Sequence, residues 1–339
     1  MNNAQKQYDV IIIGAGLAGC VLGFLLKKQK KKVLIIEQQN SKRKLKLCGG
    51  LLTQKSYDIL KEIYNDEIKK LDIIAYKKAY IINKTEKIKF DNINLYTIYR
   101  KELDDFVLNE YLKIDGEIVD NTTYTNLDLE KQKIIINNST YKFEYLVGAD
   151  GVFSQVRRNI FGCNQKKNFA LESNIKTQHQ NLEIYFFDKL KSYGWILPNN
   201  KYSMIGIGDV SSKTKLEEDF DNYLNQINVV VPNKKGAFLP TGNDFCLEYN
   251  HYVRFIGDAA GLISPITGEG IYYAVFSAKK LSEDFINYKF NMRKTIKHLR
   301  KEDFFKKIIY NHKIRSFVFN RHNRKIFRRI IDKFAKKIL

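Results

Sequence analysis

The chain has 339 residues, enough to bury a substantial core, and 44% of them are hydrophobic. With 13% aromatic residues and only 4 prolines, it is not a disordered chain, and we expect one large domain or two to three interleaved domains. Lys and Arg outnumber Asp and Glu by 58 to 37, which gives a formal net charge of +21. The 4 cysteines are far apart and form no CxxC pair, so we expect a reducing cytoplasm and neither disulfides nor a metal site.

The first predicted elements are a strand, a glycine-rich turn and a helix. Residues 8–13 are apolar and β-branched, as in a buried strand, and a helical apolar stretch continues to residue 26. The turn between them reads Gly14-Ala15-Gly16-Leu17-Ala18-Gly19. In such a turn Gly14 permits the tight bend, Gly16 lets the backbone approach a pyrophosphate, and Gly19 lets helix and strand pack closely. The first N–H groups of the helix, from Leu17 and Ala18 onward, would face the phosphates.

A second predicted strand, residues 32–37, ends in an acid. Glu37 follows Gly19 by 18 residues, the position from which a carboxylate accepts hydrogen bonds from a ribose hydroxyl. This spacing predicts a dinucleotide-binding unit without choosing between NAD and FAD. The apolar run over residues 10–26 contains the three glycines of this turn and no basic stretch precedes it, so we do not expect it to span a membrane.

Two later segments each read as a strand that ends in a Gly/Asp turn. Residues 143–151 end in Asp150 and Gly151. Residues 254–261 contain Gly257 and Asp258, and the chain then runs through Pro265, Gly268, Glu269 and Gly270 into a helix that begins at Ile271. An acid at the carboxyl end of a parallel strand can bind ribityl hydroxyls, and glycines before a helix offer N–H groups to an anionic reduced flavin.

Taken in order, these three motifs resemble those of the FAD-dependent oxidoreductases with the p-hydroxybenzoate-hydroxylase fold. The resemblance implies FAD as cofactor, with Asp258 at the ribityl chain and residues 268–271 along the isoalloxazine. Residues 99–104, Tyr-Arg-Lys-Glu-Leu-Asp, are similar to a helix start of that family and would bring Arg100 near the cofactor. Read alone, Arg100 is a surface arginine.

Two further segments resemble the geranylgeranyl reductase family. They are Leu47-Cys48-Gly49-Gly50-Leu51 and Tyr193-Gly194-Trp195-Ile196-Leu197-Pro198. The resemblance implies a Cys-Gly-Gly loop near the flavin, with Cys48 and Gly49 as cofactor contacts, and a Tyr-x-Trp segment that shapes a lipid cavity. Leu197, where that family prefers Phe, and Leu190, where a Pro is often found, depart from the pattern and leave the exact substrate open.

The candidate catalytic residues are Cys48, Tyr193 and Trp195, and each has a simpler interpretation. Cys48 is equally a small buried residue, and a tryptophan in a strand is more often part of the core. Gly49 and Gly50 either make a turn or leave room for substrate beside the flavin.

These resemblances favour a reductase that saturates C=C bonds of an isoprenoid (geranylgeranyl-type) lipid or related polyprenyl chain by hydride transfer from reduced flavin. The alternative is an FAD-dependent monooxygenase of an aromatic or quinone-type substrate, and a third hypothesis is an electron carrier or sensor. No second Rossmann fingerprint is found, because Gly206-Ile207-Gly208-Asp209 lies in a strand-like run. Electrons would therefore come from NAD(P)H that visits a shared cleft, from ferredoxin or from a quinol.

The predicted fold class is α/β, with a Rossmann-type FAD-binding domain interleaved with a mostly antiparallel β-sheet substrate domain and followed by a helical C-terminal segment. We assign residues 1–75, 98–163 and 244–285 to the FAD-binding domain and residues 76–97 and 164–243 to the substrate domain. Residues 286–339 form the basic helical segment.

The last 49 residues, 291–339, carry 17 Lys and Arg against 3 acidic residues. Apolar residues at helical spacing predict amphipathic helices with basic outer faces. Two interpretations stay open: a helical cap on the flavin domain, or peripheral docking on anionic lipid at the inner face of the cell membrane. Nucleic-acid binding is disfavoured because no recognised module supports it. The sequence does not indicate an oligomeric state.

Overall fold

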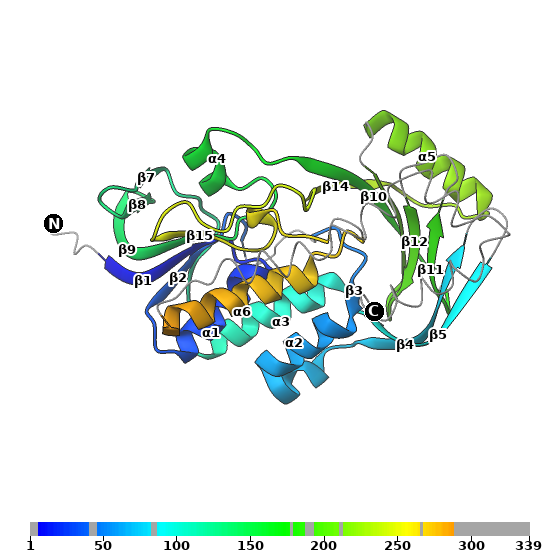
Figure 1. Ribbon diagram of the computed structural model, residues 1–339, viewed down its shortest axis with the longest axis horizontal. Coiled ribbons are helices and arrows are strands. Elements are labelled where there is room, and N and C mark those ends of the chain that lie inside the picture. Colours follow the sequence, from blue (N-terminus) through cyan, green and yellow to red (C-terminus); the bar gives the residue numbers. More distant parts are fainter. Residues whose placement is uncertain are drawn as a thin grey trace.

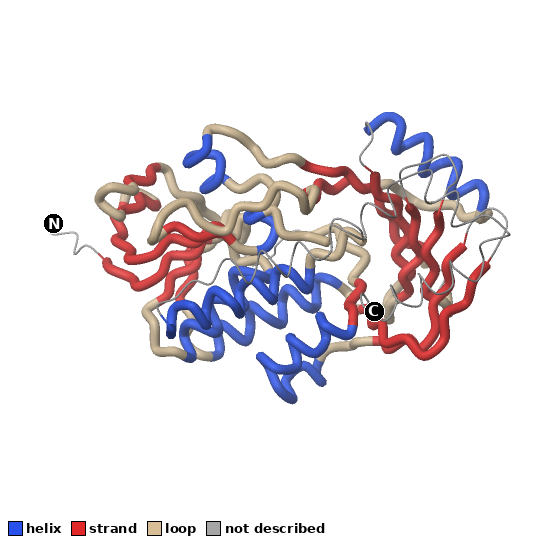
Figure 2. Tube along the Cα trace, in the orientation of Figure 1, coloured by secondary structure: helices blue, strands red, loops and turns tan. Residues whose placement is uncertain are grey.

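The computed structural model describes residues 6–40, 46–82, 87–176, 179–186, 193–209, 213–264 and 267–287. These residues form two β-sheets that lie one after the other along the long axis of the molecule, with a layer of helices against the first sheet (Figure 1). Figure 2 shows the same division, with the long helices gathered on one side of the first sheet, a short helix on its other side and one helix beyond the second sheet. The predicted α/β fold class is confirmed.

The first sheet has, within the described residues, seven strands in the order β6-β2-β1-β9-β8-β7, with β15 paired to β9. Its parallel strands are β1 (Lys6–Ile13), β2 (Val33–Ile36), β6 (Glu117–Val119), β9 (Ser139–Gly148) and β15 (Val253–Phe255). The antiparallel strands β7 (Asn126–Asp128) and β8 (Lys133–Ile136) extend it. Ile13 lies in register with Ile36 and with Gly148, so β1, β2 and β9 end at the same edge. This edge carries the predicted cofactor-binding residues that follow each strand.

Helices cover one face of the first sheet. They are α1 (Leu17–Lys28), α2 (Gln54–Tyr64), α3 (Arg100–Lys113) and α6 (Ile271–Asn287). Helix α1 packs between α3 and α6, and its side chains share a buried core with β1 and β2 (Figure 1). The shorter helices are α4 (Gln155–Phe161) and the 3-10 turns η1 (Asn65–Lys70) and η2 (Gly257–Ala260). The strand, helix and strand predicted around Gly14–Gly19 are thus confirmed as β1, α1 and β2.

The second sheet has the order β14-β10-β13-β12-β11-β4-β5-β3 among the described residues. Its strands are β3 (Leu51–Thr53), β4 (Ile74–Ile82), β5 (Lys87–Thr97), β10 (Lys167–Ile175), β11 (Leu182–Phe186), β12 (Tyr193–Pro198), β13 (Ser203–Asp209) and β14 (Lys235–Pro240). All neighbours are antiparallel except β4 and β11, which agrees with the predicted, mostly antiparallel sheet. Helix α5 (Lys213–Gln226) buries Leu216 and Phe220 against one face.

Two details concern the predicted boundaries. Strand β3 lies within residues 1–75, which we assigned to the FAD-binding domain, yet it forms an edge of the second sheet. Pro265 and the basic stretch after Asn287 fall outside the described residues, so the C-terminal prediction stays a prediction. Across the described helices, none is both long and apolar enough to cross a membrane.

Candidate functional site

A cavity of about 900 Å³ lies between the two sheets, and we call it the shared cavity. It is lined at one end by the residues that follow β1, β2 and β9, and at the other by the face of the second sheet that α5 does not cover. Every predicted cofactor-binding residue in the described part of the chain lines it except Gly19 and Gly257. The candidate catalytic residues Cys48, Tyr193 and Trp195 line it as well.

The glycine turn after β1 combines close packing with one open position. Gly14 has φ +105°, and a Cβ there would lie 2.5 Å from the carbonyl oxygen of Ala149. A Cβ on Gly19 would lie 1.9 Å from the carbonyl oxygen of Gly14, so this glycine serves packing, as predicted. At Gly16 a Cβ would meet nothing within 4 Å, and α1 starts there without a side-chain cap. The open space in front of an uncapped helix start fits the pyrophosphate of a dinucleotide.

Glu37 stands beside this turn. Its carboxylate is buried, and its two oxygens accept hydrogen bonds from the backbone N–H groups of Ala15 at 2.7 Å and Gln39 at 2.9 Å. Both bonds hold the acid at the end of β2, where it lines the shared cavity. This is the position expected of a group that binds a ribose hydroxyl.

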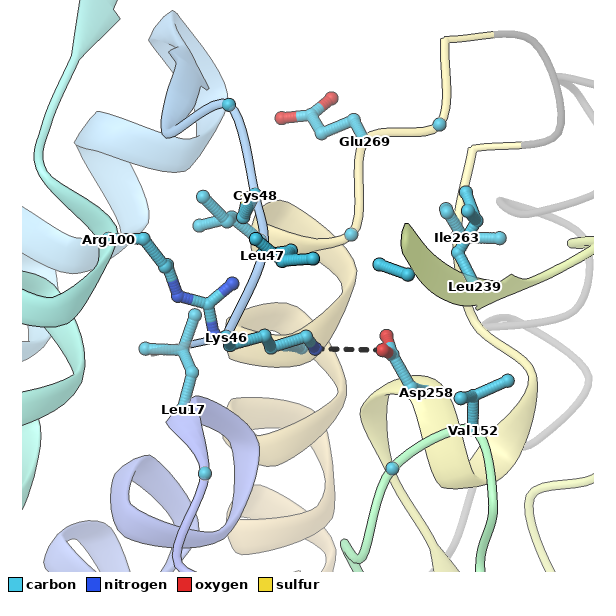
Figure 3. A pocket seen from close by; sticks show the side chains of 18 of the residues that line it. Leu17, Lys46, Leu47, Cys48, Arg100, Val152, Leu239, Asp258, Ile263 and Glu269 are labelled. Atoms are coloured by element: carbon cyan, nitrogen blue, oxygen red, sulfur yellow. Dashed lines mark hydrogen bonds and ion pairs between the residues drawn. The ribbon is translucent and has the colours of Figure 1, made fainter. Parts of the chain in front are cut away.

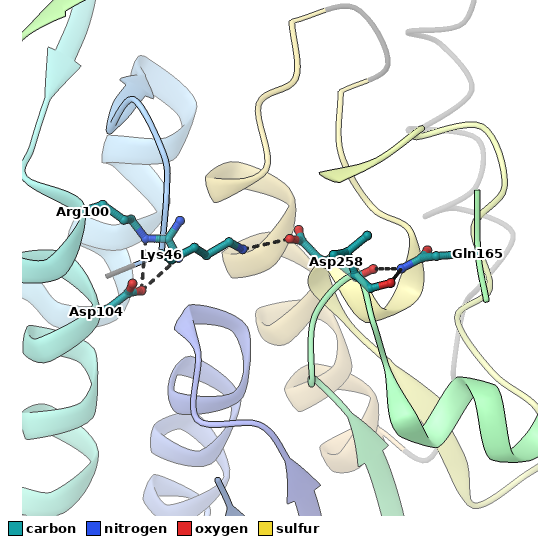
Figure 4. A network of polar contacts seen from close by, with 6 residues as sticks. Lys46, Arg100, Asp104, Gln165 and Asp258 are labelled. Atoms are coloured by element: carbon teal, nitrogen blue, oxygen red, sulfur yellow. Dashed lines mark hydrogen bonds and ion pairs between the residues drawn. The ribbon is translucent and has the colours of Figure 1, made fainter. Parts of the chain in front are cut away.

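An ion pair crosses the shared cavity opposite α1. Lys46 reaches from the loop before Cys48 to Asp258 on η2, with 2.8 Å between Nζ and Oδ2 (Figures 3 and 4). The backbone carbonyl of Asp258 accepts a hydrogen bond from the Gln165 side chain at 2.6 Å, which fixes the η2 turn. Lys46 was not predicted as a site residue. Its role depends on a contact across 212 positions, which no local pattern reveals.

Arg100 is 6% exposed, so the interpretation as a surface arginine is wrong. Its guanidinium donates to Asp104 Oδ1 from Nη2 at 2.9 Å and from Nε at 3.1 Å (Figure 4), and it interacts electrostatically with the side chain of Cys48. Arg100 therefore brings a fixed positive charge to the Cys48 loop (Figure 3). A buried cation in that place suits an anionic cofactor.

Asp150 lies at the end of β9 and faces α4. Its Oδ2 accepts from the backbone N–H groups of Gln155 at 2.7 Å and Val156 at 3.2 Å, while Oδ1 is buried and has no partner among the described residues. Burial raises the pKa of this carboxyl, although hydrogen bonds from Ser154 and from backbone N–H groups act in the opposite direction. Asp150 therefore positions α4 with one oxygen and keeps the other available beside the shared cavity.

The Cys48–Gly50 loop packs tightly against the second sheet. A Cβ on Gly49 would lie 2.5 Å from Leu197 Cδ1 and 3.5 Å from Trp195 Nε1. Gly50 has φ +70°, and a Cβ there would lie 2.0 Å from the carbonyl oxygen of Ile98. The space that a side chain at Gly49 would occupy is thus filled by Leu197, which overturns the hypothesis that this glycine leaves room for substrate. Its small size instead allows close contact with β12.

A second loop, residues 267–270, borders the shared cavity beside β12. The Tyr193 hydroxyl donates to the carbonyl oxygen of Thr267, and a Cβ on Gly268 would lie 3.1 Å from the Tyr193 oxygen. Glu269 Oε1 accepts hydrogen bonds from Thr53 at 2.8 Å and Ser56 at 2.5 Å, which tie this loop to the start of α2. Tyr193 therefore holds the loop that precedes α6.

Trp195 is both a core residue and a residue of the cavity wall, as the two interpretations of the sequence proposed. It is 8% exposed and packs in the apolar cluster of the second sheet, yet it also lines the shared cavity. Its ring lies over Gly206, where a Cβ would come within 2.5 Å of the indole. Its Nε1 is buried without a hydrogen-bond partner among the described residues.

Glu172 on β10 is a cavity-lining acid that the sequence did not single out. It is 5% exposed, and burial raises the pKa of its carboxyl to about 7, although a hydrogen bond from the Gly49 backbone N–H acts to lower it. The available signal was one acid in the apolar strand sequence Phe169-Ala170-Leu171-Glu172. A buried carboxyl at such a position points to a functional site.

The open glycine cradle, the acid after β2, and the acidic turns after β9 and β15 together define a flavin-dependent oxidoreductase with a Rossmann-type cofactor unit. The residues present fit FAD, because Gly16 leaves space at an uncapped helix start and Asp150 keeps a buried oxygen unpaired beside it. The chain belongs to the FAD binding domain family, whose model matches residues 7–215.

Curated relatives cover most of the chain. An uncharacterised protein of Methanosarcina barkeri is 29% identical over 302 residues, which span 83% of this chain and 75% of that protein. A digeranylgeranylglycerophospholipid reductase of Methanococcus vannielii is 25% identical over 326 residues, which span 85% of this chain and 82% of the reductase. The predicted resemblance to the geranylgeranyl reductase family is thereby confirmed.

Solved structures share the fold. A geranylgeranyl bacteriochlorophyll reductase-like protein from Thermoplasma acidophilum superposes with a TM-score of 0.70 at 19% identity, covering 90% of this chain and 84% of its own. A probable FAD-dependent monooxygenase from Pseudomonas aeruginosa gives a TM-score of 0.69 at 16% identity, covering 88% and 92%. The fold therefore serves both kinds of chemistry and does not distinguish between them.

Proposed function

We propose that this protein is an FAD-dependent reductase that saturates C=C bonds of an isoprenoid (geranylgeranyl-type) lipid or related polyprenyl chain. The observation that carries the proposal is the shared cavity, which joins the dinucleotide cradle to an apolar wall on the second sheet. That wall includes Ile81, Phe90, Leu182, Trp195 and Leu197. Apolar side chains in an enclosed cleft favour a hydrocarbon chain and exclude water from it. The names of the reductase relatives point to the same chemistry.

Reduction of a double bond requires the bound cofactor to lie against the apolar wall of the shared cavity. Reduced FAD, when bound, supplies a hydride equivalent to one carbon of a double bond. The chain holds the cofactor at Gly16 and Glu37, and Asp258 provides a carboxylate for its hydroxyl groups once Lys46 moves to a phosphate. The Cys48–Gly50 and 267–270 loops border the place where both ligands meet.

We propose NAD(P)H or ferredoxin as the electron donor. Residues 206–209 belong to β13, where Gly206 lies against Trp195, so they do not form a second dinucleotide turn. NAD(P)H would therefore have to reach the oxidised flavin through the shared cavity itself, whereas ferredoxin would deliver electrons from outside.

We also propose that the lipid enters from a membrane surface. Phe153 and Phe238 line the shared cavity and are 50% and 44% exposed, so they mark a point where it opens to solvent. Their rings meet edge to face at 5.4 Å, and Lys167 Nζ lies 4.2 Å from the Phe153 ring centre. Exposed aromatic rings beside a lysine suit an anionic lipid surface.

The proposed function is tested by anaerobic mixing. The purified protein with FAD bound is reduced with dithionite and mixed with a geranylgeranyl lipid while flavin absorbance and product mass are followed. The expected result is reoxidation without oxygen and a product that gains two hydrogen atoms for each bond reduced. A fully saturated lipid is the matched control and should leave the flavin reduced.

The opposite outcome has a clear form. A flavin that stays reduced with every isoprenoid lipid until oxygen is admitted, followed by an oxygenated product from an aromatic or quinone-type compound, would replace the reductase by the monooxygenase. Reversible reduction with no product from either class would favour an electron carrier.

A further inference from the structure

We propose that Glu172 is the acid that delivers the proton in this alkene reduction, from the cavity face of the second sheet, where it and Trp195 form a pair of residues with unpartnered buried polar atoms. The inference rests on the proposed function, because only a C=C reduction needs a proton at the second carbon. It assigns a catalytic residue that neither the glycine motifs nor the Cys-Gly-Gly segment indicates.

The pair is defined by two buried polar atoms without partners. Glu172 Oε2 and Trp195 Nε1 are both buried, and neither has a hydrogen-bond partner among the described residues. Both residues line the shared cavity and are more than nine-tenths buried. Buried polar atoms are almost always paired in native proteins, so two orphans at one site indicate that a ligand or a reacting group completes them.

The sheet register brings the two side chains to one face. Glu172 on β10 lies opposite Gly206 on β13, and Gly206 lies opposite Trp195 on β12. Directly opposed residues point to the same face of a sheet, and Gly206 has no side chain between the other two. The indole ring occupies the space above Gly206, so Trp195 extends toward β10.

The Cys48–Gly50 loop closes the other side of this pair. The backbone N–H of Gly49 donates to the Glu172 carboxyl, and the position of a Cβ on Gly49 lies 3.5 Å from Trp195 Nε1. The loop therefore fixes the carboxyl through one hydrogen bond and leaves Oε2 to carry the acidic proton. The ionisable neighbours of Glu172 are Tyr202 and Lys235. Lys235 lies opposite Glu172 on β14 but is exposed, and no ion pair to Glu172 is found among the described residues. Without a cation to hold it ionised, burial keeps the pKa of the carboxyl near 7, so the acid is protonated in a useful fraction at neutral pH.

In this step Glu172 supplies the proton and the reduced cofactor supplies the hydride. The π bond of the alkene breaks, one carbon gains a hydride with two electrons from the reduced cofactor, and the other carbon gains the proton of Glu172. The O–H bond of the carboxyl breaks, its electron pair stays on the carboxylate, and a proton from water restores the acid. The neighbouring Trp195 N–H can donate to the carboxylate while it is charged.

The earlier candidate donors are engaged elsewhere. The Tyr193 hydroxyl donates a hydrogen bond to the carbonyl oxygen of Thr267, and the Cys48 side chain interacts electrostatically with the buried Arg100 guanidinium. Glu172 is the group at this end of the shared cavity whose carboxyl oxygen remains unpaired.

The test compares Glu172→Gln with Glu183→Gln in the full chain with FAD bound. The glutamine keeps an oxygen that can accept from Gly49 and removes only the acid. Glu183 is a matched control, because it is a buried acid of the same sheet that pairs with Lys87 and does not line the shared cavity. Anaerobic reoxidation of the reduced protein by a geranylgeranyl lipid is measured from below to above neutral pH. We expect Glu172→Gln to slow reoxidation by about 100-fold or more and to abolish the decline in rate at high pH, with lipid affinity changed little.

A second readout does not depend on turnover. Trp195 is the only tryptophan of the chain, so its emission reports on Glu172 directly. In the oxidised wild type and in Glu183→Gln we expect a change in emission with a midpoint near pH 7, and in Glu172→Gln none. Glu172→Asp, which keeps an acid on a shorter side chain, should retain a pH-dependent rate and serves if the glutamine variant does not bind FAD.

The outcomes separate the two proposals. A Glu172→Gln protein with the wild-type rate and pH profile would overturn the role of Glu172 while the reductase stands. A wild type that yields no reduced lipid, but still shows the emission change at neutral pH, would refute the reductase and with it the proton transfer, although not the buried acid itself.

Discussion

Replacing Glu172 by glutamine is expected to change how the stability of the protein depends on pH. The wild-type carboxyl is almost fully buried, and its pKa is about 7 against an ordinary value of 4.5. Between these two values the folded protein holds a proton that the unfolded chain has released. The free energy of unfolding therefore falls as pH rises through this window.

The size of the effect follows from the shift in pKa. The free energy of unfolding falls by about 1.4 kcal/mol for each pH unit in this window. Between pH 4.5 and pH 7 the folded protein therefore loses about 3 kcal/mol of stability. Glu172→Gln carries no ionisable group and should not show this decline. At pH 8 the variant should therefore be more stable than the wild type by up to about 3 kcal/mol, less the cost of burying an amide N–H₂ group.

The assay is urea unfolding followed by Trp195 emission at a series of pH values, with FAD in the same excess throughout. Other groups with raised pKa, such as Asp150, affect both proteins equally, so the difference between the two curves isolates residue 172. Parallel curves for wild type and variant between pH 4.5 and 7 would refute the reasoning, because they would mean that Glu172 is ionised as readily in the folded protein as in the unfolded chain.

Three further predictions concern the cofactor cradle and the cavity wall. Gly16→Ala should leave folding intact, because a Cβ there meets nothing within 4 Å. The variant should bind FAD at least about tenfold more weakly, or about 1.4 kcal/mol, as measured by flavin fluorescence. An unchanged affinity would mean that the pyrophosphate does not bind at this turn. Lys46→Met should change the free energy of unfolding without FAD by less than about 1 kcal/mol, since Lys46 is half exposed, while FAD affinity falls. A larger loss of stability in urea unfolding would show that the ion pair to Asp258 stabilises the fold instead. Gly206→Ala should lower the free energy of unfolding by about 1–3 kcal/mol by displacing the Trp195 ring, and should shift the Trp195 emission. An unchanged emission spectrum with full stability would contradict the packing of Trp195 over Gly206.

Most of the cofactor unit could be predicted from the sequence because its signals are local. Gly14, Gly16 and Gly19 lie within one turn, and Glu37 follows at a fixed distance because the helix and second strand have regular lengths. Each constraint acts between neighbours in the chain, as when Gly19 meets the carbonyl oxygen of Gly14.

The far end of the shared cavity could not be predicted in the same way. Glu172, Gly206 and Trp195 become neighbours only through the register of three strands, and Gly49 reaches them from a loop more than 120 positions away. The burial of Arg100 and the path of Lys46 to Asp258 likewise depend on tertiary contacts. The contact of Gly49 with Leu197 was not predicted for the same reason, since Leu197 lies on β12, far along the chain.

The decisive experiment for the proposed reductase is a single anaerobic turnover of the reduced, FAD-loaded protein with a geranylgeranyl lipid, with products identified by mass spectrometry. We expect the flavin to reoxidise in step with the appearance of a lipid two hydrogen atoms heavier, and the saturated lipid to leave the flavin reduced. Flavin that remains reduced with the unsaturated lipid, and that reoxidises only when oxygen enters, would contradict the proposed function.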